Sequence, residues 1–322
     1  KFRKYRIKIK FKGEKMSVNS QEVTQTPGNN TVFQTWVLKG DKKACKEGFA
    51  KLCALVVNLN KTAKVRFGAN ENVNCVLGVG HDAWKKLEIS KELPKELVNF
   101  KAIKGDKHEA VSTKGDIHIH IRALNAADCF DMAQNIKEVL FKFAELTDET
   151  QGFKYHDGRA IIGFVDGTEN PDGEDRDHFA KVGKEDAKFK GGSYVFVQKY
   201  FHKMQEWNAT SVSEQEKVIG RSKEYDIEMD ESVKPTNSHS AAANVGDDKK
   251  VVRGNMPFTE GSKTGTYFIA YASTFSTVEL MLKKMFIGEP KGNSDRLLDF
   301  STPVTGALYF APTLDMLGDY EG

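Results

Sequence analysis

Apolar side chains along the first half of the chain recur with two periods that follow one another. Residues 31–38 (TVFQTWVL) alternate apolar and polar side chains and predict a half-buried strand, whereas residues 42–59 place apolar side chains at helical spacing. The same two patterns predict strands over 73–78 and 116–123 and a helix over 126–146. The first half therefore resembles a β-α-β-β-α-β unit.

A polar stretch at residues 147–152 separates this half from a second one, in which the pattern recurs. Strands are predicted at residues 160–164, 193–201, 266–272 and 307–310. Two helices are predicted to start at capping boxes, one formed by Ser211 with Glu214 and one by Ser276 with Glu279. Two similar α+β halves result.

We divide the chain into a basic and polar flexible leader at residues 1–30, an N-terminal domain at 31–152 and a C-terminal domain at 153–322. The second domain contains two long irregular inserts, residues 171–192 and 222–265. Connections of such length are uncommon in a compact domain unless they serve a function. The chemistry is therefore expected in or beside these inserts.

The composition is that of a globular protein. Of the 322 residues, 39% are hydrophobic and 29% are charged, which excludes wholesale disorder and a bundle of membrane helices. The longest apolar runs are far shorter than the about 20 residues that cross a bilayer, so no membrane partner is predicted.

The net charge of +3 is concentrated at the start of the chain. Residues 1–15 hold eight Lys or Arg and one Glu, a local charge of +7, so the remainder carries −4. Such a run can bind phosphates or anionic lipid. It also precedes Met16 and can be vector-derived sequence, which is the interpretation that we favour. The acidic remainder and the lack of a basic-aromatic motif argue against nucleic acid as a partner.

The cysteines give the expected compartment. Four of them, Cys45, Cys53, Cys75 and Cys129, show no C-x-x-C spacing, which argues against structural zinc and a redox dithiol. Each lies among apolar residues, so buried free thiols are expected, as in a reducing compartment. The chain also lacks the apolar segment of a signal peptide. We therefore expect a cytoplasmic location.

The sharpest local signal is the segment at residues 163–171 (GFVDGTENP), which follows a predicted apolar strand. Two interpretations are open for Asp166. It can belong to an ordinary Asp-Gly turn, which the residues alone favour. Alternatively, the flanking glycines can hold its carboxylate in an unusual backbone geometry where a flat ligand approaches closely.

The segment resembles the G-x-x-D-G fingerprint of the dye-decolorizing peroxidases, haem enzymes that reduce hydrogen peroxide and oxidise dyes and phenols. Further segments match this family in the same order: 79–80 with Trp84, 117–122 (IHIHIR), 235–239 (PTNSH), 253–258 (RGNMPF), 265–271 (GTYFIAY), 285–288 (MFIG) and 295–306 (DRLLDFSTPVTG). The resemblance runs from about residue 31 to residue 312 and is closest to the compact cytoplasmic branch of the family.

The resemblance implies two ferredoxin-like domains of the dimeric α+β barrel type with antiparallel sheets, and one haem b per chain in the C-terminal half. It implies that peroxide oxidises the haem to a ferryl with a porphyrin radical, which an organic donor restores in one-electron steps. Surface Tyr or Trp can relay these electrons. The candidates, by residue type only, are Trp84, Trp207, Tyr194 and Tyr200, although packing is the simpler explanation for each.

By the same resemblance, His239 in the N-S-H segment is the proximal ligand of the haem iron. The small residues after it, 240–243, could let a porphyrin settle against the backbone. A proximal histidine needs a partner on its other ring nitrogen. We choose Asp299 for this role, with Asp295 as the runner-up, and surface ion pairs are the alternative for both. His118 and His120 share one strand face, but no third ligand accompanies them, so we interpret them as half-buried strand residues.

On the opposite haem face, the family's aspartate and arginine match Asp166 and Arg253. Asp166 can shuttle a proton between the two oxygens of peroxide. Arg253 can stabilise charge on the departing oxygen, and Asn255, two residues on, points to the same side of an extended segment and can order peroxide or water. The alternative is an ion pair of Asp166 and Arg253 that only holds the inserts together.

We expect the haem propionates near Thr168, Glu169 and Asn170, whose hydroxyl and backbone N–H groups can receive them. Glu169 would repel a propionate unless a cation or water intervened, and its alternative role is a cap for the following turn. Arg221 is a further candidate for a propionate partner.

Two rivals come from other classes: a haem carrier or sensor on the same scaffold, and a haem-free ferredoxin-like interaction module. Haem binding needs His239 alone, whereas turnover also needs Asp166 and Arg253, and the chain keeps all three residues. The interaction module leaves the long inserts unexplained. We therefore predict a haem peroxidase with hydrogen peroxide and an organic electron donor as partners, in a homo-oligomer.

Overall fold

The computed structural model describes residues 18–68 and 71–322. The basic run at residues 1–15 lies outside the described residues. The prediction of a flexible leader up to residue 30 is wrong for its described part. The Gln21 side chain is buried, its carboxamide donates to the carbonyls of Leu77 and Pro312 at 2.8 Å each, and it accepts from the Leu77 backbone N–H. A polar residue can therefore anchor this segment, which hydrophobic patterning does not reveal.

The first half contains the elements that its periodicity predicts, with two small additions. Its elements are β1 (Asn30–Leu38), α1 (Lys42–Phe67), β2 (Asn74–Val79), α2 (His81–Leu87), β3 (Ile103–Lys104), β4 (Glu109–Ala110), β5 (Ile117–Ala123), α3 (Ala126–Leu140) and β6 (Ala144–Phe153). The strands β3 and β4 pair only with each other.

The second half repeats the order with longer connections. Its elements are α4 (Asp175–Ala180), η1 (Lys184–Phe189), β7 (Ser193–His202), α5 (Met204–Ala209), α6 (Val212–Ile219), α7 (His239–Ala243), β8 (Val252–Arg253), β9 (Met256–Glu260), β10 (Lys263–Ala272), α8 (Phe275–Phe286), η2 (Arg296–Asp299), β11 (Ser301–Pro303), β12 (Ala307–Ala311) and α9 (Leu314–Asp319).

The two halves share one sheet topology. In the first half the strands lie in the order β6-β1-β5-β2, and in the second half in the order β12-β7-β10-β9. In each half the first strand therefore lies between the fourth and the third, and every pairing is antiparallel. This is the ferredoxin-like order, so the predicted fold class is confirmed. The halves join where β12 meets β2 and where β6 meets β9, and the strands close into a ring.

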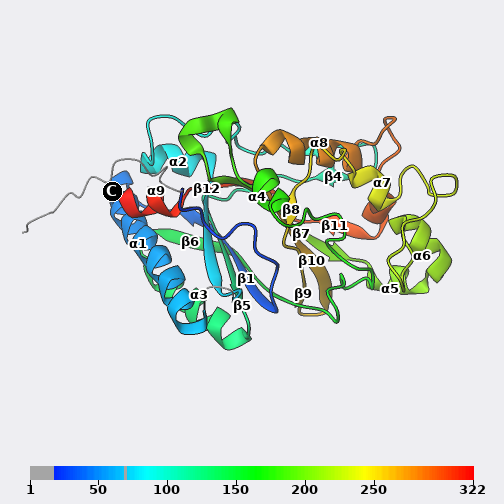
Figure 1. The fold of residues 1–322 in the computed structure, drawn as a ribbon, viewed down its shortest axis with the longest axis horizontal. Helices are drawn as coiled ribbons and strands as arrows, with labels where there is room; N and C mark the ends of the chain where they lie inside the picture. The colour runs from blue at the N-terminus through cyan, green and yellow to red at the C-terminus, as the bar shows by residue number, and fades with distance from the viewer. Residues whose placement is uncertain (1–17, 69–70) are drawn as a thin grey trace, which may run out of the picture.

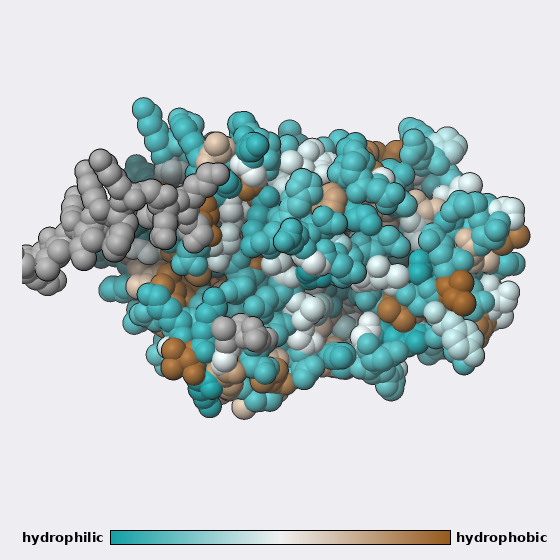
Figure 2. Space-filling model, viewed as in Figure 1, coloured by the Kyte–Doolittle hydropathy of each residue, from teal (hydrophilic) through white to brown (hydrophobic). Residues whose placement is uncertain are grey.

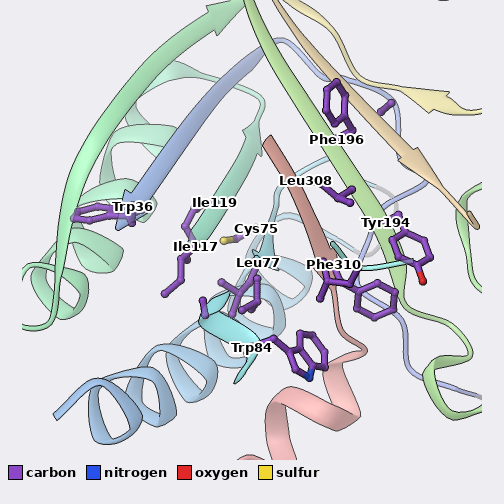
Figure 3. Close-up of a cluster of buried hydrophobic side chains, with 14 of the residues drawn as sticks. Trp36, Cys75, Leu77, Trp84, Ile117, Ile119, Tyr194, Phe196, Leu308 and Phe310 are labelled. Atoms are coloured by element: carbon purple, nitrogen blue, oxygen red, sulfur yellow. The ribbon is translucent and has the colours of Figure 1, made fainter. Parts of the chain in front are cut away.

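Helices cover the outer faces of this ring. In Figure 1, α1 and α3 lie outside the sheet of the first half, and α8 and the α5–α7 segments lie above and to the right of the strands of the second half. The buried side chains of β1, β2 and β5 beneath α1 and α3 include Trp36, Leu77 and Ile119, which Figure 3 shows in one cluster. Trp84 from α2 packs edge-on against Phe310 of β12, so this core runs from one half into the other.

Three elements differ from the predictions. The predicted helix over 126–146 ends at Leu140, and the polar stretch at 147–152 belongs to β6 rather than to a linker. Residues 160–164 form turns, and the Ala160 backbone N–H donates to the Phe164 carbonyl at 2.8 Å. The helix α8 begins at Phe275, one residue before the predicted cap Ser276. The N–H and hydroxyl of Ser276 bond to Glu96 instead of to Glu279. At the other predicted capping box only the serine acts as predicted: Ser211 accepts from the Glu214 N–H, whereas the Glu214 carboxylate pairs with Arg296.

The interior of the ring is aromatic and polar. Phe33 stacks on Tyr267 with ring centroids 4.0 Å apart, and His118 and His120 are fully buried beside it. Both histidines are therefore fully buried, whereas we predicted half-buried strand residues. Burial lowers the pKa of His118 to about 3, and His120 accepts or donates through Nδ1 to the Tyr271 hydroxyl at 2.7 Å. Among the described residues, no group of three or more His, Cys, Asp or Glu could hold a metal ion.

The outer surface is mostly hydrophilic on the face that Figure 2 shows, where hydrophobic side chains are scattered among polar ones. No helix within residues 18–68 and 71–322 has both the length and the apolar character needed to cross a bilayer.

Candidate active site

A cavity opens in the second half beside the sheet. One wall is the outward face of β7 and β10, and the opposite walls come from the 160–169 loop, from α7 with the residues after it, and from α8. Of the two inserts that the sequence analysis singled out, 222–265 contributes to the wall, whereas 171–192 contributes no lining residue. Most of the wall is apolar, and the polar groups are concentrated at the few positions described below.

One polar group of the wall is the imidazole of His239, at the first position of α7. Its Nδ1 lies 2.7 Å from Oδ2 of Asp295. Asp295 is fully buried, and its other carboxylate oxygen accepts from the Leu297 backbone N–H at 2.8 Å. The carboxylate therefore fixes both the orientation of the ring and the tautomer with the proton on Nδ1, which leaves Nε2 free to act as a ligand.

Our choice of Asp299 as the partner of His239 is wrong, and the runner-up Asp295 occupies that position. Asp295 precedes the 3-10 helix η2 and caps it, which directs its side chain inward. Asp299 ends the same helix, and its carboxylate binds Nε2 of His108 at 3.0 Å near the surface. The sequence contains both aspartates in D-R-L-L-D, and only the direction of this turn distinguishes them.

A second polar group lines the cavity from the other side. Asp166 lies between Gly163 and Gly167, both of which have a positive φ, of 94° and 84°. The positive φ of Gly163 is a backbone conformation that side chains with a Cβ rarely adopt, so the loop favours glycine there. The expected partners Arg253 and Asn255 line the same cavity, and the Asn255 carboxamide donates to Asp166 at 3.2 Å.

Asp166 and Arg253 do not form the ion pair that was the alternative interpretation. Among the described residues, no carboxylate oxygen lies within 4.0 Å of the Arg253 guanidinium. Asn255 is held instead by the sheet, because its Oδ1 accepts from the Ile269 backbone N–H at 3.2 Å. Asp166 therefore reaches the cavity from the 160–169 loop, whereas Arg253 and Asn255 come from one segment that pairs with β10.

The rim of the cavity is an ion-pair network. Arg221 binds Asp226 at 2.6 Å and lies within 3.7 Å of Glu169, and the Thr168 hydroxyl donates to Asp226 at 2.6 Å. Thr168, Glu169 and Arg221 all line the cavity, as predicted for a propionate edge. Asp226 was missed, because an aspartate in a polar insert carries no sequence signal that separates it from its neighbours.

Asn170 is the exception among the predicted rim residues. It is absent from the cavity wall, and its carboxamide binds the backbone of Arg253 through two hydrogen bonds. The prediction that Asn170 receives a propionate is therefore wrong. The loop turns after Glu169, so that the side chain of Asn170 faces β8.

The remaining wall residues include one that sequence reasoning missed. Gln198 on β7 is fully buried, lines the cavity, and accepts from the Tyr200 hydroxyl at 2.6 Å, while its Nε2 has no partner in the described part of the chain. His202, four residues after Gln198 on the same strand, also lines the cavity, and burial lowers its pKa to about 4. Polar residues at every second position of a buried strand were the signal that could have identified this face.

The residues fit a haem. The walls are apolar, one imidazole with a free Nε2 faces the cavity, and a charged rim lies beside it. The buried Gln198 Nε2 and Ser240 Oγ have no hydrogen-bond partner within residues 18–68 and 71–322 and line the same space, as expected where a bound group completes the wall. The relay candidates Trp84, Trp207 and Tyr194 are core residues with 0–2% exposure, so packing explains them, and only Tyr200 lies at the cavity.

A double ferredoxin-like scaffold with such a cavity defines a haem peroxidase class. Residues 23–154 match the model of the N-terminal domain of Dyp-type peroxidases, and residues 157–316 match the model of the C-terminal domain. The chain belongs to the Dyp-type peroxidase family.

Curated relatives agree with this assignment. The chain is 47% identical over 255 residues to a dye-decolorizing peroxidase of Mycolicibacterium paratuberculosis, covering 77% of this chain and 72% of the relative. It is 48% identical over 250 residues to a dye-decolorizing peroxidase of Rhodococcus erythropolis, covering 76% of this chain and 73% of the relative.

Solved structures agree as well. A dye-decolorizing peroxidase from Bacteroides thetaiotaomicron superposes with a TM-score of 0.90 at 49% identity, covering 94% of this chain and 98% of that one. A DypB variant from Rhodococcus jostii RHA1, solved in complex with heme, superposes with a TM-score of 0.86 at 39% identity, with coverage of 94% and 98%. The protein is therefore a haem peroxidase that acts on dyes, and the alternative of a carrier or sensor finds no support.

Proposed function

We propose that His239 binds the haem iron on one face, and that Asp166, Arg253 and Asn255 handle hydrogen peroxide on the other. The observation that carries this proposal is the pairing of His239 with the buried Asp295, because an imidazole held in this way presents a single unprotonated nitrogen to the cavity. Haem, when bound there, supplies the iron that takes oxidising equivalents from peroxide and passes them to an organic donor.

The protein contributes the proton handling. Asp166 takes the proton from the peroxide oxygen nearest the iron and returns it to the leaving oxygen, which departs as water. The Asn255 carboxamide donates to Oδ1 of Asp166, so Oδ2 is the oxygen that is free to move the proton. Arg253 adds a positive charge that no protein carboxylate within 4.0 Å neutralises among the described residues, and it stabilises the charge on the leaving oxygen.

Thr168 and Arg221 offer hydrogen-bond donors to the propionates at the rim. Arg221 is already paired with Asp226 and lies 3.5 Å from Glu228, so a propionate would share the guanidinium with these carboxylates. Glu169 is mostly exposed at 3.7 Å from Arg221, and this cation would offset its repulsion of a propionate.

The proposal predicts different losses on the two faces. His239→Ala should lose most of the Soret absorption, whereas the control His108→Ala, which changes a histidine bound to Asp299 near the surface, should keep it. Asp166→Ala and Arg253→Leu should keep the haem and slow the spectral change caused by peroxide in stopped flow by about 10²- to 10⁴-fold. Full haem binding by His239→Ala would place the ligand elsewhere, and normal rates in both other variants would reduce those residues to scaffolding.

We further propose that the chain works in the cytoplasm and forms a homo-oligomer. We also propose that residues 31–152 form its N-terminal domain and residues 153–322 its C-terminal domain. Four buried free cysteines support a reducing compartment, and burial raises the pKa of the Cys75 thiol to about 12, which keeps it unreactive. A related peroxidase from Mycobacterium smegmatis was solved in an encapsulated form. Cell fractionation tests the location, and light scattering coupled to gel filtration tests the assembly, where a monomer would contradict it.

A further inference from the structure

We propose that Asn170 is a positioning residue that sets the place of Arg253 opposite Asp166. Its Nδ2 donates to the Arg253 carbonyl at 3.0 Å, and its Oδ1 accepts from the Arg253 backbone N–H at 2.8 Å. The proposal rests on the distal role of Arg253 proposed above, and the experiment below separates the two.

The carboxamide of Asn170 takes the place of a neighbouring strand. Arg253 lies on β8 opposite Ala270 of β10, and β8 is at the end of the strand order. The next residue, Gly254, donates to Ile269 of β10 at 3.0 Å, so the N–H and C=O of Arg253 face away from the sheet. A carboxamide has one acceptor and donors in the geometry of a peptide group, and it satisfies both of these backbone groups together.

The loop that carries Asn170 also carries Asp166. The Asn170 backbone N–H donates to the Gly167 carbonyl at 2.9 Å, which closes a tight turn. Gly167 has a φ of 84°, and a Cβ there would lie 3.0 Å from Asn170 Nδ2, so the turn packs directly against the carboxamide. Asp166 and Arg253 are therefore connected by one short, closed loop and two hydrogen bonds.

Arg253 has few other constraints. No carboxylate among the described residues holds its guanidinium, and β8 itself is only two residues long. The backbone position of Arg253 therefore depends on its pairing with β10 and on Asn170. Without the carboxamide, a partly buried N–H and C=O lose their partners, and this edge of the sheet is free to move away from the cavity.

The chain contains a matched control. Asn60 in α1 binds the backbone of Cys75 in the same two-bond arrangement, with Cys75 N–H to Oδ1 at 2.9 Å and Nδ2 to the Cys75 carbonyl at 2.8 Å. This pair lies in the first half, in the core beneath β2 and away from the cavity wall. Asn60→Ala should therefore lower the stability without any effect that is specific to Arg253.

The experiment measures fluoride binding to the ferric holoprotein by absorbance, because a guanidinium stabilises a small anion on the iron without turnover. Four proteins are compared with the wild type: Asn170→Ala, Arg253→Leu, the double variant and Asn60→Ala. Arg253→Leu should weaken fluoride binding about 10- to 100-fold, as expected for a lost hydrogen bond to a charged group, and Asn170→Ala should weaken it about tenfold. In the Arg253→Leu background, Asn170→Ala should change the affinity by less than about twofold.

Each outcome decides the proposal. Wild-type affinity in Asn170→Ala, an equal loss with and without Arg253, or the same loss in Asn60→Ala would overturn it. If Arg253→Leu binds fluoride normally, the distal role of Arg253 fails first, and the role of Asn170 fails with it. If Asn170→Ala does not retain haem, Asn170→Asp replaces it in the experiment. This variant keeps the acceptor for the Arg253 N–H and loses the donor to the Arg253 carbonyl. Its fluoride affinity is then compared with and without Arg253→Leu, as for Asn170→Ala.

Discussion

The carboxylate of Asp295 is fully buried and accepts hydrogen bonds from two N–H groups. One donor is Nδ1 of His239 and the other is the Leu297 backbone. Asp295→Asn keeps the size of the side chain but offers one acceptor oxygen, so its amide N–H would face one of the two donors. We expect the peroxide reaction to slow about 10- to 100-fold in stopped flow, and the haem reduction potential to rise because the ring donates less electron density to iron.

The matched control for this variant is Asp299→Asn. It makes the same chemical change four residues away, in a half-exposed side chain that binds His108. Its reduction potential, measured by spectroelectrochemistry, should equal that of the wild type. An equal shift in both variants would mean that general charge near the haem, and not the contact with His239, sets the potential.

Single residues of the site were predictable where a motif fixes them. Asp166, Arg253, Asn255 and His239 were predicted from their segments, and all four line one cavity. The choice between Asp295 and Asp299 could not be made, because it depends on the direction of a four-residue 3-10 helix. The two hydrogen bonds of Asn170 could not be predicted either, because they join segments 83 residues apart.

At the scale of elements, hydrophobic periodicity predicted the strands β7 and β10, which are rich in aromatic and aliphatic residues. The predicted ranges, 193–201 and 266–272, nearly match the observed strands Ser193–His202 and Lys263–Ala272. Periodicity failed for β6, where Asp148 pairs with Lys199 and Glu149 pairs with Lys137. The sequence of β6 therefore resembles a polar linker, because its charges pair with a lysine of the helix α3 and a lysine of β7, and hydrophobic periodicity does not reveal such partners.

We expect the folded protein to lose stability in acid because of a histidine on β5. His118 is buried there, and neither ring nitrogen has a partner in the described structure. Burial lowers its pKa from 6.5 to about 3, so below pH 6.5 the unfolded chain takes up a proton that the folded chain refuses. Stability therefore falls as the pH drops from 6.5 toward 3, by up to about 1.4 kcal/mol per pH unit from this residue.

Replacing His118 with leucine should remove this slope. Urea unfolding at pH 7, 6 and 5 should show that His118→Leu loses less stability than the wild type on acidification. At pH 7 it should be at least as stable, because an unpartnered polar ring is replaced by an apolar side chain. The control His178→Gln changes an exposed histidine and should follow the wild-type curve. Parallel curves for His118→Leu and the wild type would contradict the assignment.

At the scale of the whole molecule, the repeat of two α+β halves could be read from the sequence, but their closure into a ring could not. The sheets meet through one strand pair at each junction, Gly152 with Phe258 and Phe310 with Val79. Such contacts leave no local pattern. The closed ring positions the site indirectly, because the distal residues lie on β8 and the segment that leads into β9, next to the first junction.

Lys199 of β7 holds that junction from the inside. Only 5% of its side chain is exposed, and its ammonium binds Asp148 of β6 at 2.8 Å and Glu260 of β9 at 2.6 Å. It therefore links both halves through an ammonium group that is largely removed from water. Lys199→Met leaves Asp148 without its cation, and we expect a loss of about 3–5 kcal/mol in the free energy of unfolding, measured in guanidinium chloride.

The double variant Lys199→Met with Asp148→Leu tests whether that loss comes from an uncompensated charge. It should be more stable than Lys199→Met alone, since replacing a buried pair by apolar side chains is often neutral, whereas removing one partner is not. Glu260→Gln removes the carboxylate that is 58% exposed and should cost less than about 1 kcal/mol, because water screens it. The variant Asp148→Leu alone completes the comparison. If the stability losses of Lys199→Met and Asp148→Leu simply add in the double variant, the ion pair contributes little, and Lys199 stabilises the junction through its contacts with the Phe201 and Phe258 rings.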